Sequence, residues 1–453
     1  MELQHIYHLF RRAAFGILPK EANTLLNYSR EEIVEMLLKE SETSTPVTVD
    51  LSPFDDFFAE NPNATNKDFS PIIMEHKELR LTFNKAWVDR MLNPSERLNE
   101  RMTLFWANTF VCQENVPPFV QRFNNTLREN ALGNFESLVA SVSREPAMMK
   151  FLNTNQNRKG HPNENFAREL MELFTLGTGH YTETDVKEAA RAFTGWSHRV
   201  DGTFVLRKRQ HDYGIKSFQG WNANLGGEEV ISIIVRKKEC AQFICEKIYR
   251  YFVNDRVNPA HVAELAEIFH PRGNIKDVIE HMLLSDWFYD TVNIGSKIKS
   301  PMDFFASIHL VVPFQFQGDK ELVFMQRLLG QLLLNPPNVA GWEGGKSWID
   351  TNTLMTRLKL PSLMIGSGLV PSWWSRRGFG INQESTYGAK LKVKEDWTMF
   401  DHNYGGLNPD ELTQAVLAGV VNNGTAAFLD KLPKDNQRDL VIQLMSLPEF
   451  QLT

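Results

Sequence analysis

HPNENFARELMELF, residues 161–174, decides the fold, because it contains the clearest helical pattern in the chain. At about 100° per residue, its polar side chains share an arc of about 140° and its apolar side chains fill the opposite side. The polar side chains are Glu164, Asn165, Arg168, Glu169 and Glu172. The apolar ones are Phe166, Ala167, Leu170, Met171, Leu173 and Phe174. This pattern predicts a helix over 164–176 with one face in a core.

The following stretch, TETDVKEAARAFTGW (182–196), predicts a second helix. Thr182 can cap its first turn, and Asp185 at the third helical position completes the pattern of a capping box. Beyond it, Asp201-Gly202 separates WSHRV from TFVLR. This pair is typical of the turn of a β-hairpin.

Helical periodicity recurs over most of the remaining chain. Helices are predicted at 3–15, 30–40, 75–92, 95–112, 118–130, 134–152, 227–253, 259–269, 274–286, 300–312 and 319–334. Polar residues, proline and glycine mark 41–72 and 335–407 as long irregular loops, and Asn408-Pro409 opens a terminal helical run. The predicted fold class is mainly α: a multi-helix, bundle-like globular body with a small β-hairpin and long irregular loops.

The domain organisation predicted from this pattern is one mainly helical domain over 1–453. Its core covers 1–365, an irregular loop region covers 366–407, and C-terminal helices over 408–453 pack on the core.

Composition excludes several classes of protein. The chain has 453 residues, of which 42% are hydrophobic and 23% charged, as in ordinary globular proteins. A net charge of −6 gives no general attraction to nucleic acid, so none is expected as a partner. Three cysteines make no disulfide framework. No run of 18 apolar residues exists, so no membrane span is predicted.

The N-terminus, MELQHIYHLFRRAAFG, does not resemble a signal peptide, because its arginines follow the apolar residues instead of preceding them. A cytoplasmic location is therefore expected.

The polar face of 164–176 has two interpretations. Its carboxylates could bind a cation or move protons, with Glu169 or Glu172 as a base, while Arg168 orients them and Asn165 contributes an amide. It could equally be a solvated face joined by the Glu164–Arg168 and Arg168–Glu172 spacings.

The helix over 3–15 carries cations on one face, among them His8, Arg11 and Arg12. The forked donors of an arginine suit phosphate, sulfate or carboxylate, so this face could bind an anion. Alternatively, it docks on the acidic helix through structural ion pairs.

The segment RKRQHDYGIKSFQG (207–220) places His211, Asp212 and Lys216 between glycines that allow sharp turns. A His-Asp pair could supply a general base or a metal ligand, and Lys216 could stabilise negative charge. The alternative is a basic surface loop.

Two further pieces are KIKSP (297–301) and NPPNVAGWEGGKSWID (335–350). The second combines Asn338, Trp342 and Trp348 with tight turns, and such loops often wall a binding pocket where aromatic rings stack on sugars or bases. The alternative is that the tryptophans pin a loop to the core.

Several familiar motifs are absent. The sequence contains no Walker loop, no GxGxxG after a strand, no GxSxG elbow and no HExxH. It also lacks a CxxC pair, which argues against a structural zinc site.

These pieces in this order resemble the bacterial family catalogued as domain of unknown function 1800. The matching stretches are HLFRRAAFG (8–16), ERMTLFWANTF (100–110), HPNENFARELMELFTLGTGHYTETDVKEAARAFTGW (161–196), QHDYGIKSFQG (210–220), KIKSP (297–301) and NPPNVAGWEGGKSW (335–348). The resemblance implies one mainly helical unit and brings no established activity or substrate. Its motif positions coincide with the charged residues singled out above.

This sequence departs from the family pattern at one place. At the place where the pattern of the family it resembles is Trp-His-x-His-Phe, this sequence reads Trp106-Ala107-Asn108-Thr109-Phe110. A transition-metal site that used both histidines would have lost two ligands here, although Glu, Asp and His211 still suit a divalent cation. The cofactor is therefore unknown. The family resemblance also implies an export signal, which this N-terminus lacks. The alternative to a cytoplasmic location is therefore export together with a signal-bearing partner.

We predict from these residues an enzyme or former enzyme in which three charged segments meet in one pocket. The reaction expected is hydrolysis or group transfer on an anionic or carbohydrate-like substrate, with a small molecule or glycan as ligand. In this hypothesis Glu169 or Glu172 is the base and His211, beside Asp212, carries the proton. Arg12, Arg168 and Lys216 hold the anion.

The rival hypothesis is a non-catalytic helical scaffold, binding protein or pseudoenzyme, with a protein partner as an alternative ligand. Its charged motifs would be buried ion-pair networks that hold the core.

Overall fold

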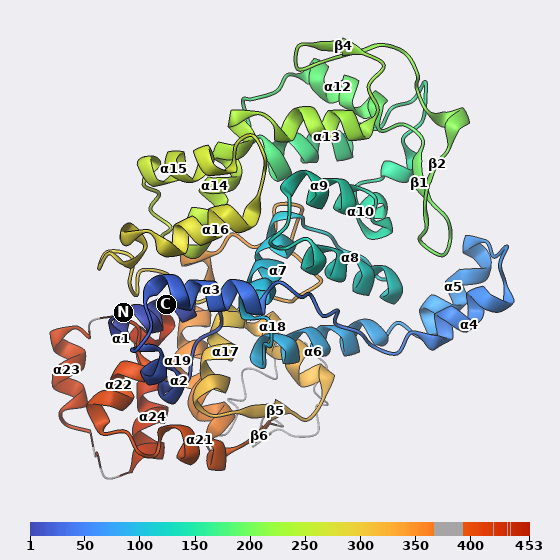
Figure 1. Ribbon diagram of the computed structural model, residues 1–453. Coiled ribbons are helices and arrows are strands. Elements are labelled where there is room, and N and C mark those ends of the chain that lie inside the picture. The colour runs from blue at the N-terminus through green and yellow to red at the C-terminus, as the bar shows by residue number, and fades with distance from the viewer. Residues whose placement is uncertain (367–392, 420, 433, 435) are drawn as a thin grey trace.

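The computed structural model describes residues 1–366, 393–419, 421–432, 434 and 436–453. Its described part is mainly helical, with three small two-stranded antiparallel sheets, which confirms the predicted fold class. Figure 1 shows the helices arranged around a central body. The N-terminus and the C-terminus lie beside each other at one end of that body.

The regular elements in the first third of the chain are all helices. Its helices are α1 (Leu3–Ala13), α2 (Pro19–Leu25), α3 (Arg30–Glu40), α4 (Ser52–Glu60), α5 (Asn66–Glu75), α6 (Leu79–Leu92), α7 (Arg97–Thr109), α8 (Pro117–Glu129), α9 (Phe135–Ser143) and α10 (Pro146–Phe151). The predicted helix over 134–152 is divided in two at Pro146, because proline has no backbone N–H with which to continue α9.

The middle of the chain contains the stretch from which the fold was predicted. Its elements are η1 (Thr154–Gln156), α11 (Asn165–Glu169), the π-helix η2 (Leu170–Thr175), α12 (Glu183–Ala192), β1 (Trp196–His198), β2 (Phe204–Leu206), η3 (Lys208–Gln210), β3 (Lys216–Phe218), β4 (Trp221–Ala223), α13 (Gly227–Val235), α14 (Lys238–Phe252), α15 (Pro259–Phe269), α16 (Ile275–Leu284) and η4 (Asp286–Tyr289). The capping box predicted at Thr182 and Asp185 begins α12.

The last third contains α17 (Pro301–Val311), β5 (Phe314–Phe316), α18 (Asp319–Leu329), η5 (Gly345–Trp348), α19 (Thr351–Ile365), β6 (Val393–Glu395), α21 (Trp397–Tyr404), α22 (Pro409–Val416), α23 (Asn423–Leu429), α24 (Gln437–Met445) and η6 (Pro448–Gln451).

Two predicted loop regions contain helices. The polar stretch 41–72 includes α4 and most of α5, and the Thr65–Asp68 capping box starts α5 despite the polar composition. Within 335–407, α19 and α21 are helical, and the Asp396 side chain caps α21. The expected irregular region 366–407 is thus wrong over 393–404, and its residues 367–392 lie outside the described part.

The predicted hairpin is confirmed. Strand β1 pairs antiparallel with β2, with Ser197 opposite Val205, across the Asp201-Gly202 turn. Gly202 has a φ of 85°, and a Cβ there would lie 2.7 Å from the Phe119 ring, so only glycine fits this turn. The β3–β4 and β5–β6 pairs were not predicted.

Hydrophobic side chains form two principal clusters. The larger one joins the helices from α1 to α16, and the second joins α17 to α24 with parts of α6 and α7. The apolar face of α1, including Ile6, Leu9 and Phe10, packs into the larger cluster. Because α1 also contacts residues far along the chain, such as Ala415 through Arg11, it lies where distant segments meet. The organisation as one domain remains a prediction.

Candidate functional site

A cavity of about 540 Å³ lies among α1, α7 and α14 and the segments 297–303 and 340–348. Six cationic side chains line it: Arg12, Arg101, Lys247, Arg250, Lys297 and Lys346. Three carboxylates line it: Asp255, Asp303 and Glu343. The aromatic side chains in its wall are Phe105, Tyr251, Trp342 and Trp348. Segments more than 300 residues apart therefore build one hollow.

Helix α1 brings Arg12 to this cavity. Its apolar face packs in the core, and Arg12 is itself only 1% exposed. Its guanidinium donates hydrogen bonds to the carbonyl oxygens of Phe252 (3.4 Å) and Asn293 (2.7 Å) and to the Ser296 Oγ (3.1 Å). The Nε–H has no acceptor among the described residues. Burial, together with the neighbouring Arg101, lowers the pKa of Arg12 to about 9.

Helix α7 supplies the second cation, Arg101, which forms a buried ion pair with Asp303. Arg101 also donates to the backbone carbonyls of Arg12 (2.9 Å) and Arg11 (3.0 Å), so it fixes the end of α1. Asp303 caps α17 with Ser300. Burial alone would raise the pKa of Asp303, but Arg101 and Ser300 lower it overall, so it stays ionised.

Lys297 belongs to a short extended segment that forms an antiparallel bridge with the C-terminal residues, between Ile298 and Leu452. Its Nζ donates to the Arg250 carbonyl oxygen (2.5 Å) and to the Asp255 carboxylate. The Lys297 side chain is 13% exposed. Burial, followed by the positive charge of Arg12, lowers the pKa of Lys297 to about 8, although Asp255 opposes this shift.

A tight turn holds Trp342 in the wall of the cavity. The Asn108 side chain donates to the Trp342 carbonyl oxygen (3.0 Å) and accepts from the Trp342 N–H (2.8 Å). Gly341 has a φ of 82°, and a Cβ there would lie 2.3 Å from the Asn108 Oδ1. Any other residue at 341 would disturb this pair of hydrogen bonds.

A second row of cations lies behind the cavity. Lys299 is buried with its ammonium 3.8 Å from the centre of the Phe450 ring, and burial lowers its pKa well below the usual value. Arg357 is buried against Phe304, and burial lowers its pKa to about 10. Arg11 donates to the Ala415 carbonyl oxygen (2.9 Å), and burial lowers its pKa to about 10. No described ion pair involves any of these three cations. These three cationic side chains therefore contact rings and carbonyl oxygens and no described carboxylate.

His8 was expected to share an anion site with Arg11 and Arg12, but it lies elsewhere. Its ring is buried against Phe288, and its Nε2 is 3.1 Å from the Phe288 carbonyl oxygen. Burial lowers the pKa of His8 well below the usual value, so the ring is neutral at pH 7. Neither His8 nor Arg11 lines the cavity, because both point to backbone carbonyls of other segments.

The helix predicted over 164–176 changes from α to π geometry at Leu170. Arg168 pairs with Glu164 (3.2 Å), as its spacing predicted. Its other partner is Glu183 (2.7 Å), not the expected Glu172. The wider turn of the π-helix alters the angular position of Glu172, which accepts a hydrogen bond from the Tyr181 hydroxyl (2.6 Å).

Glu169 and Asn165 complete this face. Burial and the nearby Glu172 raise the pKa of Glu169. The Asn165 amide donates to the Leu152 carbonyl oxygen (3.4 Å). None of these side chains lines the cavity. The catalytic roles of Glu169 and Glu172 remain predictions.

The loop 207–220 folds back on α12. The Asp212 carboxylate pairs with Arg191 (2.8 Å), which lowers the pKa of Asp212 to about 2. Lys216 is fully buried and donates to the carbonyl oxygens of Asp212 (2.5 Å) and Gly214 (3.1 Å). The Nδ1 of His211 is 2.7 Å from the Thr194 carbonyl oxygen. We call these four side chains, Arg191, His211, Asp212 and Lys216, the hairpin cluster.

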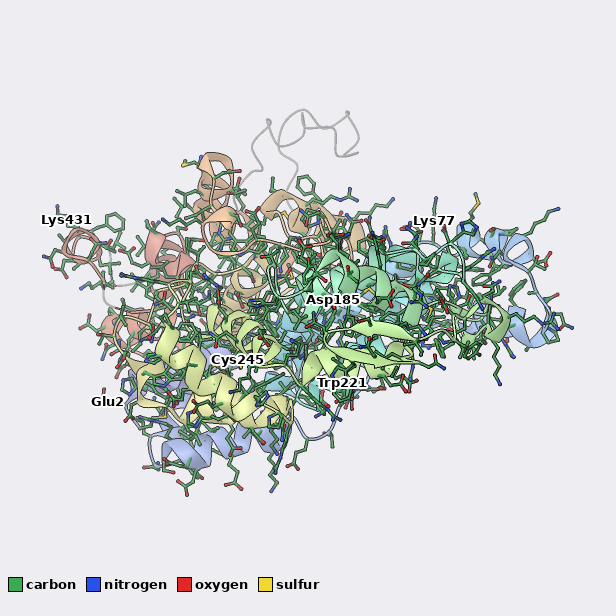
Figure 2. The ribbon with its side chains drawn as sticks, turned by 90° about the horizontal axis from the view of Figure 1, so that it is seen from above. Glu2, Lys77, Asp185, Trp221, Cys245 and Lys431 are labelled. Atoms are coloured by element: carbon green, nitrogen blue, oxygen red, sulfur yellow. The ribbon has the colours of Figure 1, made fainter. Side chains whose placement is uncertain are left out.

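The structure therefore corrects the expectation of one pocket shared by three segments. Of the candidate residues named from the sequence, Arg12 and Trp342 line the cavity, together with Trp348 of the same loop. Asn338 is exposed and closes the turn before Trp342 by accepting from the Ala340 N–H (2.8 Å). Figure 1 shows β3–β4 and α12 at the opposite end of the molecule from α1, and Figure 2 likewise separates Asp185 and Trp221 from Glu2.

Sequence reasoning missed most of the cavity's charged residues. Arg101 lies in ERMTLFWANTF, which the sequence singles out only through the family pattern, and Lys297 lies in KIKSP, a candidate piece to which no role was assigned. For Arg101, the available signal was a charged residue within a largely apolar helix, since such residues are rarely buried unless they are paired.

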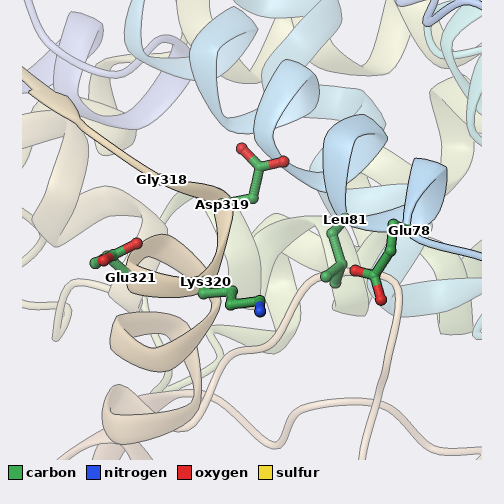
Figure 3. A pocket seen from close by; sticks show the side chains of 6 residues that line it. All are labelled: Glu78, Leu81, Gly318, Asp319, Lys320 and Glu321. Carbon is green, nitrogen blue, oxygen red and sulfur yellow. The ribbon is translucent and has the colours of Figure 1, made fainter. Parts of the chain in front are cut away.

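A smaller hollow of about 330 Å³ lies between the start of α6 and the start of α18. Figure 3 shows Glu78, Leu81, Asp319, Lys320 and Glu321 around it. Asp319 and Glu321 point away from each other in this view, and Lys320 extends toward Leu81. Its charged side chains do not converge on one point, so it makes a weaker candidate.

Within the described residues, no group of three or more His, Cys, Asp and Glu side chains is arranged to hold a metal ion. Among the described helices, none has the length and apolar character required to cross a bilayer.

Comparison with known proteins gives a family but no function. A family model described as a protein of unknown function, DUF1800, matches residues 8–452. Neither the curated proteins nor the solved structures contain a match. Because the family model covers nearly the whole chain, this protein belongs to the DUF1800 family of proteins of unknown function.

Proposed function

We propose that the central cavity binds a small anionic molecule, on which the protein acts by hydrolysis or group transfer. The observation that supports this most directly is Arg12, a fully buried guanidinium at the cavity without a carboxylate partner among the described residues. A buried charge without a counter-ion costs several kcal/mol, and a bound anion would offset that cost.

The balance of charge around the cavity supports the same proposal. Asp303 is paired with Arg101, and Asp255 with Lys297. Arg250 is paired with Glu246. Three lining cations, Arg12, Lys247 and Lys346, then have no ion-pair partner within the described residues, against one unpaired lining carboxylate, Glu343. A bound anion would neutralise part of this excess of charged side chains.

The shape and lining indicate a ligand with a flat or ring-shaped part. The volume of about 540 Å³ lies in the usual range for small-molecule sites. Trp342 and Trp348 are each 7% exposed, so their rings are held in place. Rings in such positions stack on sugars and other planar groups, which supports an anionic carbohydrate-like ligand.

A structural role is favoured for the charged side chains of two networks: the hairpin cluster, and Arg168 with its partners Glu164 and Glu183. In the hairpin cluster and the Arg168 network, the charged side chains have partners in the same network. We therefore propose that Arg168, Asp212 and Lys216 stabilise the fold. Glu169, Glu172 and His211, which do not line the cavity, are weaker candidates for a catalytic base than the cavity residues.

The binding test uses inorganic pyrophosphate and glucose 6-phosphate, measured by titration calorimetry, with glucose as the uncharged comparison. Arg12→Met should weaken binding of both anions by at least about tenfold, because a hydrogen bond to a charged group contributes roughly 1.5–3 kcal/mol. Lys346→Met should weaken it by a smaller factor, and it removes no described hydrogen bond of the side chain, so folding should be preserved.

Arg168→Met is the matched control, since it removes the same charge at a residue that does not line the cavity. An equal loss of binding in Arg168→Met would contradict a specific site, as would a wild-type protein that binds neither anion. Phosphate release from glucose 6-phosphate then distinguishes catalysis from binding: binding without turnover in the presence of added divalent cations would favour a non-catalytic binding protein.

A further inference from the structure

We infer that Lys297 is a nucleophilic amine that forms an imine with the carbonyl group of an anionic aldehyde or ketone bound in the cavity. This inference rests on the proposed anion site, because it requires the charged end of the substrate to be held there. It adds a reacting residue and a chemical class of substrate to that site.

The backbone of Lys297 is fixed, which positions its side chain. The Lys297 N–H donates to the Thr453 carbonyl oxygen (3.3 Å), and the Thr453 N–H donates to the Lys297 carbonyl oxygen (2.8 Å). Two residues on, the Lys299 N–H donates to the Gln451 carbonyl oxygen (2.8 Å). The amine is therefore presented to the cavity from a pinned strand-like segment, as precise chemistry requires.

The surroundings of the amine favour its neutral, nucleophilic form. The charged groups that face the same cavity are the cations Arg12, Arg101, Lys247, Arg250 and Lys346 and the carboxylates Asp255, Asp303 and Glu343. Burial and Arg12 outweigh Asp255, and the pKa of Lys297 falls to about 8. Roughly one amine in ten is then neutral at pH 7, against about one in 3,000 for an ordinary lysine. Lysines beside another cation are activated in this way.

Imine formation needs only the Lys297 amine, the carbonyl substrate and a group that carries protons, for which Asp255 is in place. The lone pair of the neutral Lys297 amine attacks the carbonyl carbon, and the carbonyl oxygen takes a proton to give a carbinolamine. Asp255, which accepts a hydrogen bond from the amine, can take the proton that the nitrogen loses on attack and pass it to the carbonyl oxygen. It can then take the second nitrogen proton and pass it to the departing hydroxyl group. Water leaves and the C=N bond forms, without any oxidant or reductant.

The other lysines of the cavity lack this combination. Lys346 is exposed. Burial also lowers the pKa of Lys247, whose ammonium lies 4.9 Å from the centre of the Phe243 ring. Neither has a carboxylate partner among the described residues to exchange the proton. These two lysines are therefore internal controls for the reactivity of Lys297.

The experiment uses the full chain and pyridoxal 5′-phosphate, an aldehyde that carries a phosphate, followed by borohydride reduction and peptide mass mapping. Reduction converts the imine to a stable secondary amine. The adduct is expected on Lys297 at least about tenfold more often than on Lys346 or Lys247. Pyridoxal, which lacks the phosphate, should label Lys297 less, and added pyrophosphate should protect it.

The pH dependence separates a nucleophile from a structural lysine. Labelling should be half-maximal near pH 8 in the wild type. It should move to higher pH in Arg12→Met, because loss of the neighbouring cation stabilises the protonated amine. Lys297→Arg keeps the charge and should abolish the adduct, whereas Lys208→Arg, on an exposed loop that does not line the cavity, should leave it unchanged.

The outcomes distinguish this inference from the proposed function. If the wild type binds pyrophosphate but the adducts spread evenly over exposed lysines, or persist in Lys297→Arg, the imine is overturned and the anion site stands. If the wild type neither binds pyrophosphate nor forms an adduct, both are overturned.

Discussion

The cavity and the hairpin cluster are built from similar side chains but use them differently. In the hairpin cluster, Asp212 pairs with Arg191 and Lys216 donates to two backbone carbonyls. At the cavity, Arg12 has carbonyl and hydroxyl acceptors but no carboxylate partner among the described residues, and its Nε–H is unsatisfied. A charge that is satisfied within the fold stabilises it, whereas a buried charge left without a counter-ion is what a ligand site requires.

The stretch with the densest charge in the sequence is not the one that lines the cavity. The stretch with the densest charge, 161–174, belongs to the region where the charges pair with one another. Shorter stretches with fewer charges, such as 297–301, reach the cavity. Charge density in the sequence is therefore a poor guide to the site, and the presence or absence of a counter-charge in space is a better one.

The largest expected effect is on the hairpin cluster. Lys216→Met would leave the carbonyl oxygens of Asp212 and Gly214 and the Asn224 amide oxygen without their shared donor. A hydrogen bond from a charged group contributes roughly 1.5–3 kcal/mol, and water can replace part of it here because Gly214 and Asn224 are exposed. The loss of all three bonds should therefore lower the free energy of unfolding by about 3 kcal/mol. Urea denaturation measures it.

Lys208→Met, on the exposed part of the same loop, is the control and should change stability by less than about 0.5 kcal/mol. A small effect of Lys216→Met would mean that the hairpin cluster does not hold the fold. Anion binding by folded Lys216→Met should match that of the wild type.

Unlike Lys216, Lys297 should contribute to the stability of the fold only at alkaline pH. The pKa of Lys297, about 8, lies below the ordinary value of 10.5, so the folded state binds fewer protons than the unfolded state between these values. The stability of the wild type relative to Lys297→Met should therefore rise as the pH increases from 8 to 10.5. One pKa unit corresponds to about 1.4 kcal/mol, so the rise can reach about 3 kcal/mol.

Below pH 8, Lys297→Met should then be as stable as the wild type or more stable, because the Asp255 carboxylate that loses its partner is 48% exposed and is hydrated. Denaturant titrations at a series of pH values measure the difference. A difference that does not change between pH 8 and 10.5 would show that Lys297 carries an ordinary charge.

The smallest effect is expected from Asp212 in acid. Its pKa, about 2 instead of 3.8, means that its ion pair with Arg191 stabilises the fold above pH 3.8 and that this contribution disappears as the pH falls through 2. Because the pair is partly hydrated, the loss should be about 1 kcal/mol. The stability of the wild type relative to Asp212→Asn, measured by denaturation from pH 5 downward, should shrink accordingly.

The same comparison in an Arg191→Met background provides the check. The dependence on Asp212 should vanish there, because no guanidinium remains to hold the carboxylate ionised. If it persists, other groups set the acid stability of the hairpin cluster.

Local structure was largely predictable because its causes are local. The burial of Phe166, Ala167, Leu170 and Phe174 follows the predicted apolar face. The Thr182–Asp185 capping box and the Asp201-Gly202 turn are likewise formed by neighbours in the chain. The prediction was wrong where composition was misleading: capping by Thr65 and by Asp396 starts helices in stretches rich in polar residues.

The π-helix shows where a local rule failed. The 100° projection predicted an Arg168–Glu172 pair, but the change of geometry at Leu170 moves Glu172 to Tyr181 and leaves Arg168 to Glu183. No signal at that position announces the change, because the backbone hydrogen bonds shift by one residue without altering the apolar pattern.

The sequence alone determined the helical character, most helix positions and the family, since each depends on residue order and on neighbours within one or two turns. Only the tertiary structure decided which charges meet. The site depends on contacts such as Arg12 with Asn293, which are 281 residues apart, and the partner of a charge at that separation is set by packing and not by spacing. The same guanidinium could have ended on a carboxylate; the fold left it beside a cavity.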